Sequence, residues 1–515
     1  MTKKLLQLIS MVSVSAYICA AAELPKQVEF TKAQLYDKIK GGWAGQMIGC
    51  SYGGPTEFKF KFKRIPDDYE IPWKANNIIK ATNLKGDFSG LYDDLYLDIT
   101  FMDIFERFGL DAPRREFKKA IAESKYPLWC ANRQARVEYL DGMDPDAPVS
   151  WKTNLNSNDI DFQIESDFAG LMSPALPQAA LKYADTVGRA INGGEGFYCG
   201  AYVATMYSLA FVLDNPRDVV VESMKILPKK SFTYKIVSSI SDYHAKNPND
   251  WKSAWQMFTD KFCTSEIRSY LGNQDIYAPY NLAYIIIGLL YGDGDFGKTA
   301  DISTRCGLDS DCNPSNACGI LGAIQGYSKI PEKWLAPLRQ HESTVFFTGT
   351  TYTCEKVYAV GFSHALQTLK NYGAKVSNDG NISVEVKMPE PIPFEYEPKL
   401  TKISNVKLPV LNAKNTVVES EIDGLVVSCT IDGLAKKSPH SEIDGICASV
   451  ECWVDGKKVR TANFYFDEFK YPRNHELFRW TTEFDGKHKV RLELKNPHPK
   501  FEPLNLNLLG FKEEK

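Results

Sequence analysis

Residues 308–314 read Leu308-Asp309-Ser310-Asp311-Cys312-Asn313-Pro314, and residues 92–94 read Tyr92-Asp93-Asp94. Each acidic pair lies where a helical pattern begins, and the dipole of a helix stabilises negative charge at that end. If folding brings the two pairs together, four carboxylates meet and offer only oxygen ligands. Such a set suits Mg²⁺, and also Mn²⁺ or Ca²⁺, better than zinc. The alternative is that each aspartate only caps its own helix.

The region from about Thr31 to Tyr372 has a mainly helical pattern. Thr31-Lys32-Ala33-Gln34 is a capping-box sequence, which predicts the start of a helix. Glycines follow at positions 41, 42, 45 and 49, and glycine weakens an exposed helix. We therefore expect these glycines to allow close contact with another helix or approach of the backbone to a ligand.

Both acidic pairs fall where helices are predicted to begin. Apolar residues at helical spacing predict a helix from Leu91 to Phe108, with Asp93 and Asp94 in its first turn. Pro314 suits the first position of a second helix, made of small residues. Glu57 lies in a glycine-rich turn and adds a further carboxylate. If Glu57 does not bind metal, it can serve as a general acid or base.

The pattern changes after the helical region. Residues 386–400 are rich in proline and predict an extended, semi-rigid linker. From residue 401 to residue 515, alternating polar and apolar residues predict strands. Asp-Gly pairs, which favour tight hairpin turns, interrupt these strands at Asp432-Gly433, Asp455-Gly456 and Asp485-Gly486. This region fits a β-sandwich.

The first residues have the pattern of a secretory signal peptide. Lys3 and Lys4 precede an apolar run that ends in small residues at Ala22. We therefore expect residues 1–22 to be removed and the protein to be exported to the periplasm or the cell exterior. The alternatives are a membrane anchor formed by this apolar run and a lipoprotein attached through Cys19. No later segment is apolar over the roughly eighteen residues that a membrane span needs.

Composition sets broad limits on the function. The chain has 515 residues, more than one hydrophobic core usually supports, so two domains are expected. With 61 basic and 64 acidic residues its formal charge is −3, which does not favour nucleic acid as a partner. Composition alone does not identify the substrate; the family resemblance described below implies a small molecule or a glycan. The sequence does not indicate the oligomeric state.

Three blocks together resemble the ADP-ribosylglycohydrolase family. They are residues 49–57, which end in Glu57; residues 92–95, Tyr92-Asp93-Asp94-Leu95; and residues 307–313 with the small-residue segment 319–323. The resemblance covers roughly residues 32 to 330. It implies an all-α domain with a binuclear magnesium centre, which we assign to residues 23–385. The expected fold is therefore mainly α, with a smaller all-β sandwich domain after the helical domain.

The resemblance implies a role for each acidic residue of the blocks. Asp93, Asp94, Asp309 and Asp311 would bind the metal, and Glu57 would be the catalytic acid or base. The chain departs from the family pattern where Cys50 replaces an aspartate and where Tyr92, Leu95 and Cys312 replace threonines. Because the family threonines add hydroxyl ligands, the number of ions is left open at one or two.

Four further polar residues are candidates for substrate binding. They lie in or beside segments that resemble an exported bacterial branch of the family: Glu165, Asp167, Glu195 and Asn281. The alternative is that these residues form loops and helix caps. The sequence thus predicts an exported, metal-dependent glycoside hydrolase that cleaves a glycan or a ribosyl-type substrate. An ADP-ribosyl-protein hydrolase and a non-catalytic sugar-binding protein with a degraded metal site are the alternatives.

Overall fold

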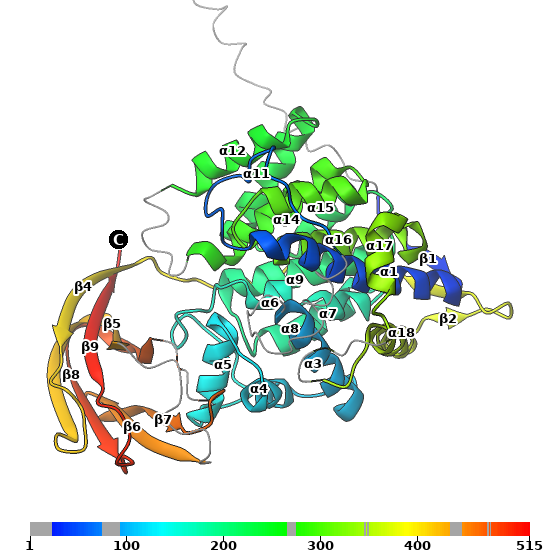
Figure 1. Cartoon of the computed structure of the whole chain (residues 1–515). Coiled ribbons are helices and arrows are strands. Elements are labelled where there is room, and N and C mark those ends of the chain that lie inside the picture. Colours follow the sequence, from blue (N-terminus) through cyan, green and yellow to red (C-terminus); the bar gives the residue numbers. More distant parts are fainter. Residues whose placement is uncertain are drawn as a thin grey trace, which may run out of the picture.

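The structure is a computed structural model that describes residues 23–74, 93–264, 274–343, 347, 350–432, 445–470, 473 and 475–514. The predicted signal peptide, Tyr92 and Gly433 lie outside the described residues. A large helical domain is followed by a smaller antiparallel sheet domain (Figure 1), which confirms the predicted fold class. Among the described residues, no helix combines the length and the apolar character that crossing a membrane requires.

The helical domain begins with α1 and continues without a long strand to α18. Its first helices are α1 (Lys32–Gly53), α3 (Asp93–Phe108), α4 (Arg114–Glu123), α5 (Cys130–Leu140), α6 (Asp161–Ile164), α7 (Asp167–Leu171), α8 (Pro177–Gly188) and α9 (Gly194–Leu209). The later helices are α10 (Pro216–Ser223), α11 (Phe232–Lys246), α12 (Trp251–Phe262), α14 (Ala278–Gly292), α15 (Phe296–Arg305), α16 (Cys312–Gln325), α17 (Glu332–Arg339) and α18 (Cys354–Asn371). Short 3₁₀ turns are η1 (Gly54–Thr56), η2 (Met224–Ile226), η3 (Gln274–Ile276) and η4 (Tyr327–Lys329).

The predicted capping box is present at the start of α1. The backbone N–H of Gln34 donates to the hydroxyl of Thr31 at 3.1 Å, and the Gln34 side chain accepts from the backbone N–H of Thr31 at 2.9 Å. These two bonds satisfy backbone donors that the first turn of a helix leaves unpaired. The predicted start of the first helix is therefore confirmed.

Helices α1 and α16 pack backbone against backbone. Gly41, Gly45, Gly49 and Gly53, four residues apart, form a stripe along α1 that faces α16. A Cβ atom on Gly45 would lie 2.1 Å from the carbonyl oxygen of Cys318, so only glycine fits there. The last glycine of the stripe lies against the backbone of Ser310, between the two aspartates of the second acidic block. The predicted close helix contact is confirmed, and it leads to the acidic residues.

A small sheet that the sequence does not indicate joins the two ends of the helical domain. Strand β1 (Gln27–Phe30) and strand β2 (Lys375–Val376) both pair antiparallel with β3 (Ile382–Glu385). The proline-rich segment that follows is extended and packs along the helices. For example, the backbone N–H of Ile392 donates to the carbonyl of Ile226 at 2.8 Å.

The C-terminal domain is one antiparallel sheet of six strands, in the order β4-β9-β5-β8-β6-β7. The strands are β4 (Leu400–Lys407), β5 (Val417–Asp432), β6 (Ile446–Val454), β7 (Lys457–Tyr465), β8 (Glu476–Lys495) and β9 (Asn505–Glu513). The long strands β5 and β8 pair with each other at the centre of this sheet, and the domain has its own hydrophobic core. The described strands thus form one continuous sheet, whereas a β-sandwich was expected. The Asp455-Gly456 turn joins β6 to β7 as predicted. The turn predicted at Asp485-Gly486 is wrong, because Gly486 pairs with Gly424 inside β8.

The sheet domain contacts the end of α5 (Figure 1), where several of the described bonds between the domains meet at one buried carboxylate. Asp141 accepts from Arg460 Nε at 2.6 Å and from both terminal nitrogens of Arg473 at 2.8 Å. The backbone N–H of Asn463 donates to the same carboxylate at 2.8 Å, and its side chain donates to the carbonyl of Leu140. Because the Asp141 side chain is fully buried, these bonds fix the sheet domain against the helical domain.

Candidate metal centre and active site

The four aspartates of the two acidic blocks meet between α3 and the start of α16. Asp93 and Asp94 form the first turn of α3, and Asp309 and Asp311 lie in the tight turn before α16. In this turn Gly307 and Leu308 have positive φ angles of 87° and 57°. The structure thus brings together the residues that the sequence predicts as metal ligands.

Two overlapping groups of side chains have the spacing of metal ligands. In one group Asp93, Asp94 and Cys312 offer ligand atoms within 4.8 Å of one another, and in the other Asp309, Asp311 and Cys312 do so. Cys312 belongs to both groups. The oxygen-only ligand set expected from the sequence is therefore incomplete, since a sulfur atom lies among the carboxylates.

Several carboxylate oxygens of this cluster are buried without a hydrogen-bond partner among the described residues. They are Oδ2 of Asp94 and both side-chain oxygens of Asp311. Asp311 occupies the N-cap position of α16, yet its side chain makes no capping hydrogen bond. Leaving an ionised carboxylate buried and unpaired is costly, and a cation removes that cost. The residues therefore fit a bound cation better than a capping role.

Burial and mutual repulsion disturb the ionisation of the cluster. Burial raises the pKa of Asp94 to about 7, and the neighbouring charge of Asp309 adds to this effect. Burial also raises the pKa of Asp311 well above its ordinary value, and the charges of Glu57 and Asp309 contribute to this rise. Each carboxylate thus makes its neighbours harder to ionise, as expected of a site that needs positive charge.

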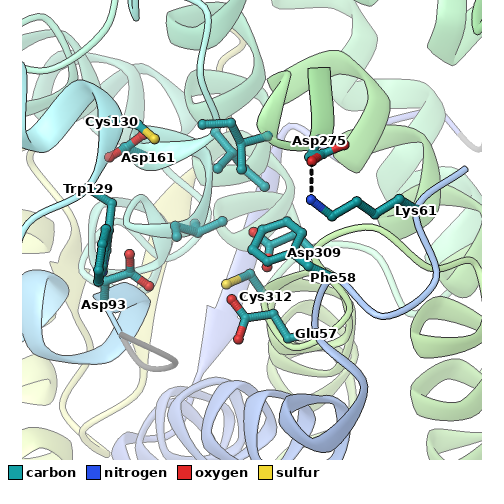
Figure 2. Close-up of a pocket in the computed structure, with 13 residues that line it drawn as sticks. Glu57, Phe58, Lys61, Asp93, Trp129, Cys130, Asp161, Asp275, Asp309 and Cys312 are labelled. Atoms are coloured by element: carbon teal, nitrogen blue, oxygen red, sulfur yellow. Dashed lines mark hydrogen bonds and ion pairs between the residues drawn. The ribbon is translucent and has the colours of Figure 1, made fainter. Parts of the chain in front are cut away.

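Asp93, Asp309 and Cys312 of this cluster line a cavity of about 320 Å³ (Figure 2). Glu57, Cys312 and Asp309 gather on one side of the cavity, and Asp93 faces them with Trp129 beside it. Lys61 and Asp275 form an ion pair on the wall. The remaining lining residues are Phe58, Cys130, Ile160, Asp161, Ile164 and Ile276. The cavity thus combines an acidic end with a partly apolar wall.

Glu57, the predicted catalytic residue, lines this cavity directly after η1. The backbone N–H of Phe58 donates to the carbonyl of Leu308 at 3.0 Å, which joins the Glu57 turn to the second acidic block. Burial, together with the charges of Asp309 and Asp94, raises the pKa of Glu57 to about 9. The carboxyl group of Glu57 therefore keeps its proton more readily than an exposed glutamate does.

Asp161 is a site residue that the sequence does not reveal. It begins α6, lines the cavity, and accepts from the backbone N–H groups of Ala131 and Asn132 in the first turn of α5. Burial raises the pKa of Asp161 to about 6, although these two hydrogen bonds oppose the rise. Trp129 and Cys130 reach the cavity from the start of α5. No motif marks these residues, because the packing of α5 and α6 places them.

The four predicted substrate-binding residues do not line the cavity. Glu195 accepts from Phe232 N, Thr233 N and Thr233 Oγ1 at 2.7–2.9 Å, so it caps α11. Asn281 accepts from the backbone N–H of Asp309 at 3.3 Å, which positions the second acidic block.

The other two candidates are fully buried. Asp167 accepts from the hydroxyl of Tyr207 and from the side chain of Asn316, both at 2.7 Å. Glu165 accepts from the side chain of Asn132, while its Oε2 has no partner among the described residues. Both side chains therefore make hydrogen bonds inside the helical domain and do not reach the cavity.

Comparisons with known proteins identify the family of the chain. The sequence model of the ADP-ribosylglycohydrolase family matches residues 31–360, so the chain belongs to that family. This membership supports a glycohydrolase-type function, and the family is generally metal-dependent. No curated protein matches the chain significantly. One matching solved structure is titled "ADP-ribosylglycohydrolase-related protein complex"; it is 16% identical and has a TM-score of 0.43. The match covers 65% of this chain and 99% of that chain.

Proposed function

We propose that the protein is an exported, metal-dependent hydrolase that cleaves a glycosidic bond of a neutral sugar in this cavity. The observation that carries the proposal is that Asp93 and Asp309 line a cavity of substrate size, while their neighbours Asp94 and Asp311 have buried carboxylate oxygens without a hydrogen-bond partner among the described residues. A substrate that enters the cavity meets the acidic cluster directly.

The acidic residues have two different roles in the proposed mechanism. Asp93, Asp94, Asp309 and Asp311 would hold one or two divalent cations. Such a cation, when bound, orients sugar hydroxyls and stabilises developing negative charge. Glu57 has no hydrogen bond or ion pair to its carboxyl group among the described residues, so its proton is available to a leaving group in the cavity.

The charge of the cavity favours a neutral substrate. Its described lining holds the carboxyl groups of Glu57, Asp93, Asp161, Asp275 and Asp309, while its only described cationic side chain already pairs with Asp275. A pyrophosphate group would find no free cationic side chain in the described lining and would depend on the bound cations alone. A neutral glycoside is therefore favoured over ADP-ribose.

The wall opposite Glu57 offers a surface for a sugar ring. Trp129 lines the cavity and is 40% exposed, although large aromatic side chains are usually buried. An exposed indole face can pack against the apolar face of a sugar. This contact would orient the ring beside Asp93.

The export part of the proposal rests on residues 1–22, whose charged start, apolar run and small-residue end are typical of a signal peptide. N-terminal sequencing of the protein secreted by its cells checks this part. A mature chain that starts near Glu23 supports it, and an uncleaved start at Met1 contradicts it.

The catalytic proposal is tested with a panel of neutral glycosides beside ADP-ribosyl-arginine and ADP-ribosyl-serine. We expect hydrolysis of a glycoside that is lost in Glu57→Gln and Asp309→Ala, with the bound metal lost only in Asp309→Ala. Glu123→Gln, an exposed change at the end of α4, is the matched control for Glu57→Gln. Cleavage of the ADP-ribosyl substrates alone would contradict the proposed substrate class, and full activity of Glu57→Gln would contradict its role.

A further inference from the structure

We propose that Cys312 binds the metal through its sulfur, so that the centre prefers a thiophilic divalent cation such as Zn²⁺ or Co²⁺ over Mg²⁺. This inference rests on the metal centre of the proposed function and adds to it both a ligand and a metal preference.

The position of Cys312 is the first argument. It is the one residue shared by the two groups whose ligand atoms lie within 4.8 Å of one another among the described residues. Figure 2 shows its sulfur between Glu57 and Asp309, on the side of the cavity that faces Asp93. A cation held by either pair of aspartates is therefore within reach of the sulfur.

The burial of Cys312 also favours contact with a cation. Cys312 is the first residue of α16 and directly follows Asp311 in the chain. The residue is only 2% exposed, yet it lines the cavity. Water therefore competes little for a cation at this point.

The second, independent observation concerns the carboxylates around the sulfur. Oδ2 of Asp94 and both side-chain oxygens of Asp311 are buried and lack hydrogen-bond partners among the described residues. Burying charged carboxylate oxygens without such partners is costly, so a cation is expected between them. The cluster is thus built for a cation, and Cys312 lies within it.

The chemistry of sulfur determines which cation is preferred. A thiolate is a soft ligand that favours zinc and related ions, whereas carboxylates alone suit Mg²⁺, Mn²⁺ or Ca²⁺. For a mixed set of ligands, affinity rises from Mn²⁺ through Co²⁺ to Ni²⁺ and Cu²⁺, and Zn²⁺ also binds tightly. Exchange of oxygen for sulfur at this position therefore shifts the preference away from Mg²⁺.

A cobalt titration of the metal-free, full-length protein tests the inference. If Cys312 is a ligand, Co²⁺ gives a sulfur-to-cobalt charge-transfer band in the near ultraviolet. We expect the band to be lost in Cys312→Ser, which keeps an oxygen at this position. Cys318→Ser is the matched control, because Cys318 is a buried cysteine of the same helix that lies outside both ligand groups. The control should keep the band.

Calorimetric titration gives a second measurement. We expect the ratio of Zn²⁺ to Mg²⁺ affinity to fall at least about tenfold in Cys312→Ser, since even residues behind the ligands change metal affinity by about 10–100-fold. X-ray absorption of the zinc-loaded, unmutated protein should show a Zn–S distance of about 2.3 Å, so the test does not depend on whether a variant folds.

Two outcomes separate this inference from the proposed function. Cobalt binding without a charge-transfer band, together with zinc absorption that shows only oxygen neighbours, overturns the role of Cys312 and leaves the aspartate centre intact. Absence of any tightly bound divalent cation overturns the metal centre itself, and the role of Cys312 with it.

Discussion

Substitution of Gly45 by alanine tests whether the contact between α1 and α16 is as close as the structure shows. A Cβ atom at this position would lie 2.1 Å from the carbonyl oxygen and 2.6 Å from the carbonyl carbon of Cys318. Both are backbone atoms, so no side chain can turn away. The two helices must separate by about 1 Å at this point, which weakens dispersion contacts along the glycine stripe.

Gly42→Ala is the matched control. A Cβ atom there would meet the methyl groups of Leu171, the nearest at 2.4 Å, and these lie at the end of a flexible side chain. Both variants gain about 1 kcal/mol because alanine favours the helix more than glycine does. Overpacking of a core costs about 1–3 kcal/mol, and a clash with rigid backbone lies at the upper end of that range. We therefore expect Gly45→Ala to be about 2 kcal/mol less stable than Gly42→Ala.

Differential scanning calorimetry provides the measurement. A difference of about 2 kcal/mol corresponds to a separation of roughly 4–8 °C between the two melting temperatures for a domain of 150–250 residues, and to less for a larger one. Equal melting temperatures for the two variants would refute the reasoning, because they would show that α1 and α16 tolerate a methyl group between their backbones.

Three further predictions concern the domain contact, the cavity and the metal. Asp141→Asn should lose about 3 kcal/mol at neutral pH, because the buried Arg460 and Arg473 lose their counter-charge. Burial raises the pKa of Asp141, but Arg473 and Arg460 outweigh burial and hold it below its ordinary value of 3.8. A lowered pKa in the folded state contributes its full stability above the pKa of the unfolded chain, and this contribution is lost as the pH falls through the folded-state pKa. The difference in melting temperature between wild type and Asp141→Asn should therefore narrow as the pH falls below about 4. A constant difference would contradict this prediction. Trp129→Ala should raise KM for the glycoside while kcat changes little, and steady-state kinetics with an unchanged KM would rule out the stacking contact. Removal of metal with a chelator should lower the melting temperature, because a ligand at about 1,000 times its Kd adds about 4 kcal/mol of stability. In the Asp311→Asn variant, the chelator should change the melting temperature much less. An equal change in wild type and variant would contradict the role of Asp311 as a metal ligand.

Local chemistry explains which features the sequence predicts well. The capping box at Thr31 and the acidic first turn of α3 depend on residues close in the chain, so they can be recognised without the fold. The glycine spacing along α1 predicts a close helix contact but not its partner. The two acidic motifs alone were consistent both with a shared metal site and with separate helix caps. The order of the three blocks, which resembles the family pattern, favoured the shared site.

Features that depend on packing could not be predicted in this way. Asp161 and Trp129 reach the cavity because α6 lies against the start of α5, and neither residue has a motif. The Asp485-Gly486 pair has the sequence of a turn, yet it continues a strand because Gly486 pairs with Gly424 across the sheet. From the sequence, Cys312 was expected only to remove the hydroxyl ligand of the threonine that it replaces. In the structure its sulfur lies among the carboxylates.

Helix α5 contributes to the cavity at its start and to the domain contact at its end. The first turn is held by Asp161 on the cavity wall, and the helix is followed by Asp141, which carries the sheet domain. The 11 residues of α5 span only about 16 Å. Removal of the sheet domain would take away the two arginines that pair with Asp141 and would expose this carboxylate to water. A truncated helical domain would therefore lack the contacts that hold the end of a helix whose start lines the cavity.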